Sequence, residues 1–273
     1  MLLFPPAKIN IGLYVTGKRD DGYHNISSLF FPLNLCDILE LNPDEAQGLS
    51  TDKLSVSGLP IPGNSPDNLI LKACRKLREI KNLPFFKIHL HKIIPTGAGL
   101  GGGSSDGAFM LNAINQFSNP GLTPEKITEI ALSLGSDCPF FLNPVSQLAS
   151  GRGEELIELP INLKGYWISI FNPGIHVSTK NAYEMVDINT PELPLTEALK
   201  LPVVQWKNKV ENAFEKSVFK LHPEISALKQ SLYQSGAVYA AMSGSGSSVF
   251  GIFKEKKEWN AQLERAHIWT ELI

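Results

Sequence analysis

The sequence predicts an α+β protein with two domains, and three observations support this fold class. Segments of alternating hydrophobicity, typical of strands, are interspersed with segments whose apolar residues recur at helical spacing. They do not follow the regular strand–helix alternation of a doubly wound sheet, which favours α+β. The chain of 273 residues is long enough for two cores, and a Pro- and Gly-bearing stretch around Leu159–Gly165 suggests a boundary. We therefore expect domains over residues 1–160 and 161–273.

The composition is that of an ordinary globular protein without a nucleic-acid footprint. The formal charge is only -2, and the basic residues are scattered rather than striped. The apolar start of the chain has no basic region and is cut short by proline, and no apolar segment reaches membrane-spanning length. The three cysteines lie far apart, which argues against a disulfide framework. We expect a cytoplasmic protein without membrane contact, as a monomer or weak homodimer.

The N-terminal half begins with a strand over Ala7–Val15, where Ile9 and its alternate neighbours form one apolar face. Lys8 and Asn10 lie on the opposite face, which we expect to line a cleft. Cys74 falls on the apolar face of a predicted helix and is interpreted as core filler. The further elements expected here are strands over 37–41, 54–57 and 86–92 and helices over 67–80 and 104–117.

Later helices and strands are marked by their boundaries. Thr123 and Pro124 form a helix start, and Gly135 a stop. The remaining elements expected are strands over 166–171, 237–242 and 249–253 and helices over 223–234 and 255–266.

A glycine-rich loop between the strand over 86–92 and the helix over 104–117 gives the strongest functional signal. Glycines let backbone N–H groups approach a ligand, and the helix N-terminus adds free donors and a positive dipole end. Ser104 and Ser105 add hydroxyls for phosphate or Mg²⁺. The sequence therefore predicts a phosphate-binding loop made of Pro95, Thr96, Gly97, Ala98, Gly99, Leu100, Gly101, Gly102, Gly103, Ser104 and Ser105, with Ser105 as the metal ligand.

Two other interpretations of this loop fit less well. A flexible linker would not be bounded by an alternating strand and an amphipathic helix. Gly97, Gly99 and Gly102 match the dinucleotide-binding pattern, but that motif needs an acidic residue about 20 residues further on, where this chain has a turn. No lysine follows the glycines, so the loop is not a Walker motif either.

An acid and a lysine complete the requirements for phosphoryl transfer to an alcohol. Such a reaction needs a group that accepts the hydroxyl proton and a positive charge near the attacking oxygen. Asp137 and Lys8 supply both, although Asp137 alone is more often a cap or turn former and Lys8 alone more often a solvated surface charge. A second Gly–Ser loop lies between two apolar strands and, unless it is a simple hairpin turn, forms a wall of the same cleft. Its predicted ATP-binding residues are Ser243, Gly244, Ser245 and Gly246.

Three blocks in this order, Pro6–Asn10, Pro95–Ser105 and Met242–Phe250, resemble the signature motifs of the GHMP kinases. Because the blocks span almost the whole chain, the resemblance is more specific than any single glycine motif. It implies an N-terminal domain like the second domain of ribosomal protein S5, a ferredoxin-like C-terminal domain, and ATP with Mg²⁺ as cofactors.

Finer features are similar to the GHMP kinases that act on 4-diphosphocytidyl-2-C-methyl-D-erythritol in the non-mevalonate isoprenoid pathway. These are the segment Arg19–His24 after the first strand, the loop sequence GLGGGSSDGA and the turn Gly135–Phe141. The resemblance implies that Lys8 and Asp137 are a catalytic dyad and that Asn10 positions the substrate. Gly107, Ser136 and Cys138 depart mildly from the family pattern without touching a group that has a chemical role.

The same resemblance implies a cytosine-binding site. Tyr23 and Tyr183 would be the two rings that hold the base, and His24 would hydrogen-bond its edge. Stacking on flat apolar rings suits a pyrimidine. The expected reaction is transfer of the ATP γ-phosphoryl group to the 2-hydroxyl of this small-molecule substrate. Two alternatives stay open: another GHMP kinase, acting on homoserine or phosphomevalonate, and a non-catalytic nucleotide-binding protein. The Tyr23–His24 pair argues against the first, and the dyad against the second.

Overall fold

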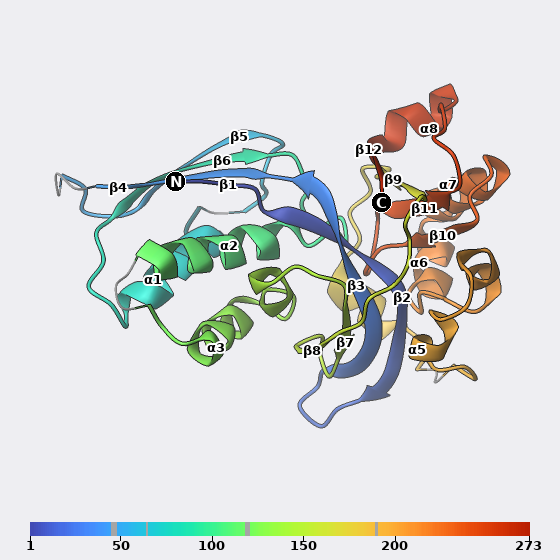
Figure 1. The fold of residues 1–273 in the computed structure, drawn as a ribbon, viewed down its shortest axis with the longest axis horizontal. Helices are drawn as coiled ribbons and strands as arrows, with labels where there is room; N and C mark the ends of the chain where they lie inside the picture. Colours follow the sequence, from blue (N-terminus) through green and yellow to red (C-terminus); the bar gives the residue numbers. More distant parts are fainter. Residues whose placement is uncertain (45–47, 64, 118–120, 189–190) are drawn as a thin grey trace. The chain divides into compact units, whose positions relative to one another are not determined.

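The computed structural model describes the chain except for residues 45–47, 64, 118–120 and 189–190 (Figure 1). It divides into two compact units, each made of three segments. Unit 1 comprises Met1–Lys8, Pro32–Thr96 and Gly101–Pro144, and unit 2 comprises Ile9–Phe31, Gly97–Leu100 and Val145–Ile273. The predicted sequence domains over 1–160 and 161–273 stay a prediction.

Unit 1 is a four-stranded sheet covered on one face by three helices, which lie below the sheet in Figure 1. Its strand order is β1-β4-β6-β5, with β4 antiparallel and β5 parallel to β6. The elements are β1 (Leu2–Leu3), β4 (Ile38–Pro43), β5 (Lys53–Gly58), β6 (Phe86–Lys92), α1 (Leu69–Arg78), α2 (Gly102–Phe117), α3 (Pro124–Leu134) and the short 3-10 turns η1 (Ser65–Asp67) and η2 (Pro139–Leu142).

The helices of unit 1 begin and end where local chemistry dictates. Asn68 caps α1, since its side-chain oxygen accepts a hydrogen bond from Ile70 N at 2.9 Å. Thr123 caps α3 in the same way, and the helix ends at Gly135, as the sequence predicts. Cys74 is fully buried on α1, and burial raises the pKa of its thiol to about 12, which confirms its interpretation as core filler.

Unit 2 contains most of one sheet and the whole of a second. The first has the order β2-β3-β7-β8, and the second the order β10-β11-β9-β12 with every neighbour antiparallel. In chain order the strands of the second sheet come second, third, first and fourth, which is the ferredoxin-like arrangement. The elements are β2 (Pro6–Lys18), β3 (His24–Cys36), β7 (Gln147–Ser150), β8 (Glu155–Glu158), β9 (Trp167–Phe171), β10 (Tyr239–Met242), β11 (Val249–Phe253) and β12 (His267–Leu272).

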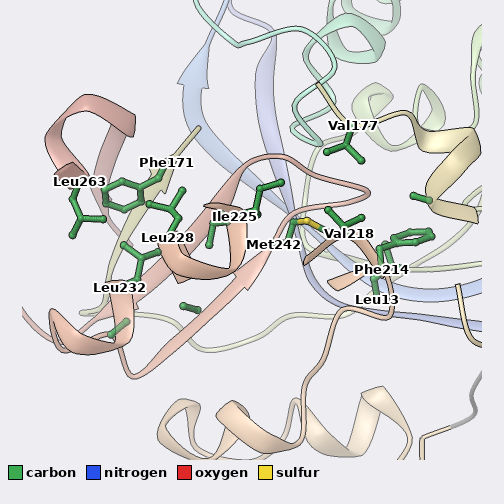
Figure 2. Close-up of a cluster of buried hydrophobic side chains, with 14 of the residues drawn as sticks. Leu13, Phe171, Val177, Phe214, Val218, Ile225, Leu228, Leu232, Met242 and Leu263 are labelled. Atoms are coloured by element: carbon green, nitrogen blue, oxygen red, sulfur yellow. The ribbon is translucent and has the colours of Figure 1, made fainter. Parts of the chain in front are cut away.

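Helices fill the connections of this second sheet and form its core with it. Figure 2 shows Phe171 and Met242 from the sheet packed with Ile225 and Leu228 from α7, and Leu13 from β2 joins the same cluster. The helical elements are α4 (Thr179–Glu184), α5 (Leu195–Ala198), η3 (Val203–Asn208), α6 (Glu215–Leu221), α7 (Pro223–Gln234) and α8 (Ala261–Ala266). Among the residues described, no helix combines the length and hydropathy needed to cross a membrane.

Two expectations differ from the structure, and some strands were not expected at all. β2 is buried on both faces rather than one, since Lys8 and Asn10 are only 3% and 2% exposed. The helix expected over 255–266 is confined to α8, because residues 255–260 are not helical. The long strand β3 and the terminal strand β12 have no counterpart among the sequence predictions. The mixed helices and sheets confirm the α+β class.

Candidate active site

The proposed dyad is an ion pair within unit 1. Lys8 lies on β2 and Asp137 in the turn between α3 and η2, and Nζ of Lys8 is 3.3 Å from Oδ2 of Asp137. The lysine side chain is 4% exposed and the carboxylate side chain 34%. At this distance the positive charge of the ammonium attracts the negative charge of the carboxylate. The arrangement provides a solvent-facing carboxylate that can accept a proton and a buried cation behind it.

The turn that carries Asp137 is fixed by the residues after it. Cys138 N donates to Gly135 O at 3.1 Å, which closes the turn, and Phe141 is fully buried. Gly101 of the phosphate-binding loop lies against this turn with φ +71°, and a Cβ there would be 2.7 Å from the Phe141 ring and 3.1 Å from Cγ of Lys8. A side chain at 101 would therefore displace the dyad directly.

A buried cluster of three charges, Asp37, Lys92 and Asp106, lies behind the same loop. Lys92 Nζ donates to Oδ2 of Asp37 and, at 2.8 Å, to Oδ2 of Asp106. All three side chains are at most 4% exposed. Burial raises the pKa of Asp106, the Lys92 ammonium opposes the shift, and the Asp37 carboxylate adds to it. Lys92 also explains Gly102, where a Cβ would lie 2.9 Å from Nζ.

The middle of the phosphate-binding loop, Gly97–Leu100, belongs to unit 2 and is held there by the second Gly–Ser loop. Ser243 Oγ donates to Gly99 O at 2.8 Å, and Ser248 N donates to Ala98 O at 3.1 Å. A Cβ on Gly99 would lie 2.9 Å from the carbonyl carbon of Ser243 and closer still to its oxygen. The two glycine loops are thus packed backbone against backbone.

Asn10 is held by the same loop. Its backbone N donates to Ser243 Oγ at 3.2 Å, and its Nδ2 donates to Ser28 Oγ at 2.8 Å. Ser28 Oγ in turn donates to Gly12 O at 2.7 Å. Ser243 is fully buried, and its hydroxyl joins the substrate-positioning candidate to the loop that contains Gly99.

The remaining residues of the second loop differ in exposure. Gly244 and Gly246 are buried and have φ of +56° and +95°. Ser245 is partly exposed, and its hydroxyl is 2.9 Å from Thr179 Oγ1 at the start of α4. ATP contacts of this loop stay a prediction.

The three residues expected to bind a base lie in unit 2. Tyr23 is 53% exposed at the β2–β3 hairpin, next to His24 at the start of β3. The His24 and Tyr183 rings are stacked, with centroids 5.1 Å apart and planes 22° apart. Phe214 packs edge-on against Tyr183 at 4.8 Å and fixes its ring. The structure thus brings two of the three residues, His24 and Tyr183, into contact.

The start of α2 carries one hydroxyl, that of Ser105, whose oxygen is of the kind that Mg²⁺ accepts as a ligand. Among the described residues, no three His, Cys, Asp or Glu side chains are grouped to hold a metal ion. Ser105, the predicted metal ligand, is fully buried, and its hydroxyl has no partner among the described residues. Ser104 instead forms a hydrogen bond with the thiol of Cys138. Burial raises the pKa of that thiol to about 12. Ser105 therefore offers an unused oxygen one turn into the helix.

Sequence reasoning missed the role of Lys92 and of its partners Asp37 and Asp106. A lysine at a strand end is usually solvated, and only its position just before the loop could have drawn attention to it. The ATP contact expected of Ser243 stays a prediction, and the structure adds the internal hydrogen bonds of its hydroxyl.

Comparison with known proteins agrees with these features. The family model for the N-terminal domain of GHMP kinases matches residues 68–143, and the model for their C-terminal domain matches residues 202–266. The 4-diphosphocytidyl-2-C-methyl-D-erythritol kinase of Porphyromonas gingivalis is 44% identical over 280 residues and covers 100% of both chains. The chain belongs to this family of GHMP kinases. The family's enzymes from Parabacteroides distasonis (43% identical, covering 96% of this chain and 95% of the relative) and Cytophaga hutchinsonii (47%, 94% and 94%) are similarly close.

Solved structures agree with the family. A crystal structure of 4-(cytidine 5'-diphospho)-2C-methyl-D-erythritol kinase is 33% identical, with a TM-score of 0.78 over 92% of this chain and 90% of that one. The phosphomevalonate kinase of Streptococcus pneumoniae, at 13% identity and a TM-score of 0.67 over 100% of both chains, shares the fold alone. The two-domain GHMP kinase fold expected from the sequence is thus confirmed, and kinase activity in this family implies ATP as the phosphoryl donor.

Proposed function

We propose that the protein transfers the γ-phosphoryl group of ATP to the 2-hydroxyl of 4-diphosphocytidyl-2-C-methyl-D-erythritol, a step of the non-mevalonate isoprenoid pathway. The observation that supports the chemistry is the ion pair between Lys8 and Asp137, 3.3 Å apart, with the carboxylate one-third exposed. Family membership supports the substrate, since relatives that match almost the full chain carry this activity in their names.

The residues divide the reaction between them. The Asp137 carboxylate accepts the proton of the substrate hydroxyl as its oxygen bonds to the γ-phosphorus and the bond to the ADP oxygen breaks. The Lys8 ammonium pairs with Asp137 and stabilises the negative charge at the attacking oxygen. The N–H groups at the start of α2 and the loop from Pro95 to Ser105 bind the triphosphate.

Mg²⁺ enters as the partner of ATP. The unused Ser105 hydroxyl and the phosphate oxygens would hold it, and the ion supplies neutralisation of the phosphate charge. The cytoplasmic location expected from the sequence is part of this proposal. His24 and Tyr183, with Tyr23 beside them, would bind the cytosine, and Asn10 would position the acceptor end of the substrate.

The test is ADP release with Mg-ATP and four acceptors: the cytidylyl substrate, homoserine, mevalonate and phosphomevalonate. We expect turnover of the cytidylyl compound alone. Turnover of another alcohol would refute the substrate, and no turnover with any of the four would refute kinase activity towards this class.

A variant tests the dyad. Asp137→Asn keeps the shape of the side chain but removes the proton acceptor, so kcat should fall about 10²- to 10⁴-fold with little change in substrate binding. Asp187→Asn makes the same chemical change at a carboxylate that is 65% exposed and pairs with Lys216, and should leave kcat unchanged. Equal kcat in the two variants would refute the role of Asp137 as the proton acceptor.

A further inference from the structure

The turn between β7 and β8 presents one arginine, Arg152, beside the expected base-binding residues. Ile26 N of β3 donates to Gly151 O at 2.8 Å, which ties this turn to the strand that begins with His24. Gly151 has φ +64° and Gly153 φ +110°, so glycines on both sides let the chain turn sharply around Arg152. The position of the arginine backbone is therefore set by the same sheet that carries His24.

The guanidinium lies against the ring of Tyr23. Cζ of Arg152 is 4.6 Å from the ring centroid, within the range of a cation–π contact. The side chain of Arg152 is 28% exposed, and Tyr23 is 53% exposed. One solvent-facing surface thus combines an aromatic ring with a positive charge.

The Glu154 carboxylate contacts this guanidinium at Nε, away from its outer end. Glu154 faces the near side, with Oε1 3.4 Å from Nε and Oε2 2.5 Å from the Arg152 backbone N. Asp21 is occupied by Arg19 Nε at 3.0 Å and by Tyr23 N at 3.1 Å. No residue in the described part of the chain accepts a hydrogen bond from Nη1 or Nη2 of Arg152. These two nitrogens form the outer edge of the planar guanidinium, which is open. This is the edge that binds phosphate in a bidentate manner.

We infer that Arg152 binds the diphosphate of the cytidylyl substrate. This inference rests on the proposed function, which assigns the base to Tyr23, His24 and Tyr183 but leaves the two phosphates without a partner. A single ribose separates a cytidine base from its first phosphate, so a guanidinium in contact with the ring below the base can reach that phosphate. A planar fork with two free donor groups matches two phosphate oxygens, and its charge offsets theirs.

Binding measurements on the full chain distinguish two roles of Arg152: a contact with phosphate, or only a packing contact that supports the Tyr23 ring. Cytidine, CMP and CDP are titrated by calorimetry into the wild type, Arg152→Met and Arg152→Lys. Arg152→Met should weaken CDP about 10- to 100-fold and cytidine less than about twofold, because only CDP offers the charge-assisted bonds. Arg152→Lys should recover part of the CDP affinity, since it restores the charge without the fork.

Lys18→Met is the matched control, because Lys18 is an exposed cation on the β2–β3 hairpin that also carries Tyr23. It should leave all three affinities within about twofold of wild type, the range expected of a solvated surface charge. In steady-state kinetics Arg152→Met should raise KM for the cytidylyl substrate by the same factor as for CDP, with kcat and KM for ATP nearly unchanged.

Equal weakening of cytidine and CDP would overturn the inference and make Arg152 a support for the Tyr23 ring. Unchanged CDP affinity in Arg152→Met, or no CDP binding by the wild type, would overturn it as well. Failure of the proposed function gives a different result. The cytidylyl compound would then not be phosphorylated by the wild type, whereas the selective loss of CDP binding in Arg152→Met would persist.

Discussion

Removal of the Asp37 carboxylate should destabilise unit 1 more than any surface change. Asp37 is fully buried, and its Oδ1 accepts hydrogen bonds from Ile93 N at 2.6 Å and Ile94 N at 2.9 Å. Its Oδ2 binds Lys92. Asp37→Ala therefore leaves two backbone N–H groups without an acceptor and leaves Lys92 with one carboxylate, that of Asp106.

The expected cost follows from this loss of partners. Breaking a buried ion pair by removing one member costs about 3–5 kcal/mol. At about 2–4 °C per kcal/mol for a chain of this size, Tm should fall by about 6–20 °C. Asp37→Asn should cost less, because an amide oxygen can still accept from Ile93 and Ile94 although the charge is lost.

Urea unfolding followed by circular dichroism measures the difference, with Asp187→Ala as an exposed control expected within about 0.5 kcal/mol of wild type. If Asp37→Ala stayed within about 1 kcal/mol of wild type, or matched Asp37→Asn, the charge cluster would not be what holds the residues before the phosphate-binding loop. The reasoning from buried charges would then be refuted.

Two further outcomes are expected. Gly99→Ala should abolish activity and lower Tm, because its Cβ would collide with the Ser243 backbone. Gly103→Ala has open space around its Cβ and should stabilise α2 by up to about 1 kcal/mol. If Gly103→Ala melted at a lower temperature than Gly99→Ala, the packing of the two loops would be contradicted. Burial lowers the pKa of His267 from 6.5, against a raising effect of Glu264, so the unfolded chain binds this proton more readily. Stability should thus fall as pH drops through about 6.5, and His267→Phe should flatten that dependence in urea melts at pH 5–8; an unchanged slope would exclude His267 as its source.

Local patterns made much of unit 1 predictable. The cap at Thr123, the stop at Gly135 and the alternation in β6 each act within a few residues, and the structure has these elements at the expected places. β3 was missed because Ser27-Ser28 and Pro32 interrupt its alternation. Its strand character comes from pairing with β2 and β7, which a local pattern does not contain.

The candidate site shows the same division. The type of each residue in the dyad was readable, since an acid and a cation are what phosphoryl transfer requires. The role of Lys92 could not be read from the sequence, because its partners Asp37 and Asp106 lie 55 and 14 residues away in the chain. The hydrogen bond between Ser243 and Asn10 was not readable either, because it spans 233 residues. Polar groups that satisfy one another across such separations look, in sequence, like solvated ones.

The interleaving of the two units has a consequence for attempts to dissect the protein. Six chain segments alternate between the units, so the backbone passes from one to the other five times. No truncation from either end releases an intact unit: a cut after Pro144 would leave the strand pair of residues 9–31 in one fragment and β7–β12 in the other. We therefore expect proteolytic fragments to survive only as nicked complexes, and genetic complementation by separately expressed halves to require that both halves be present together.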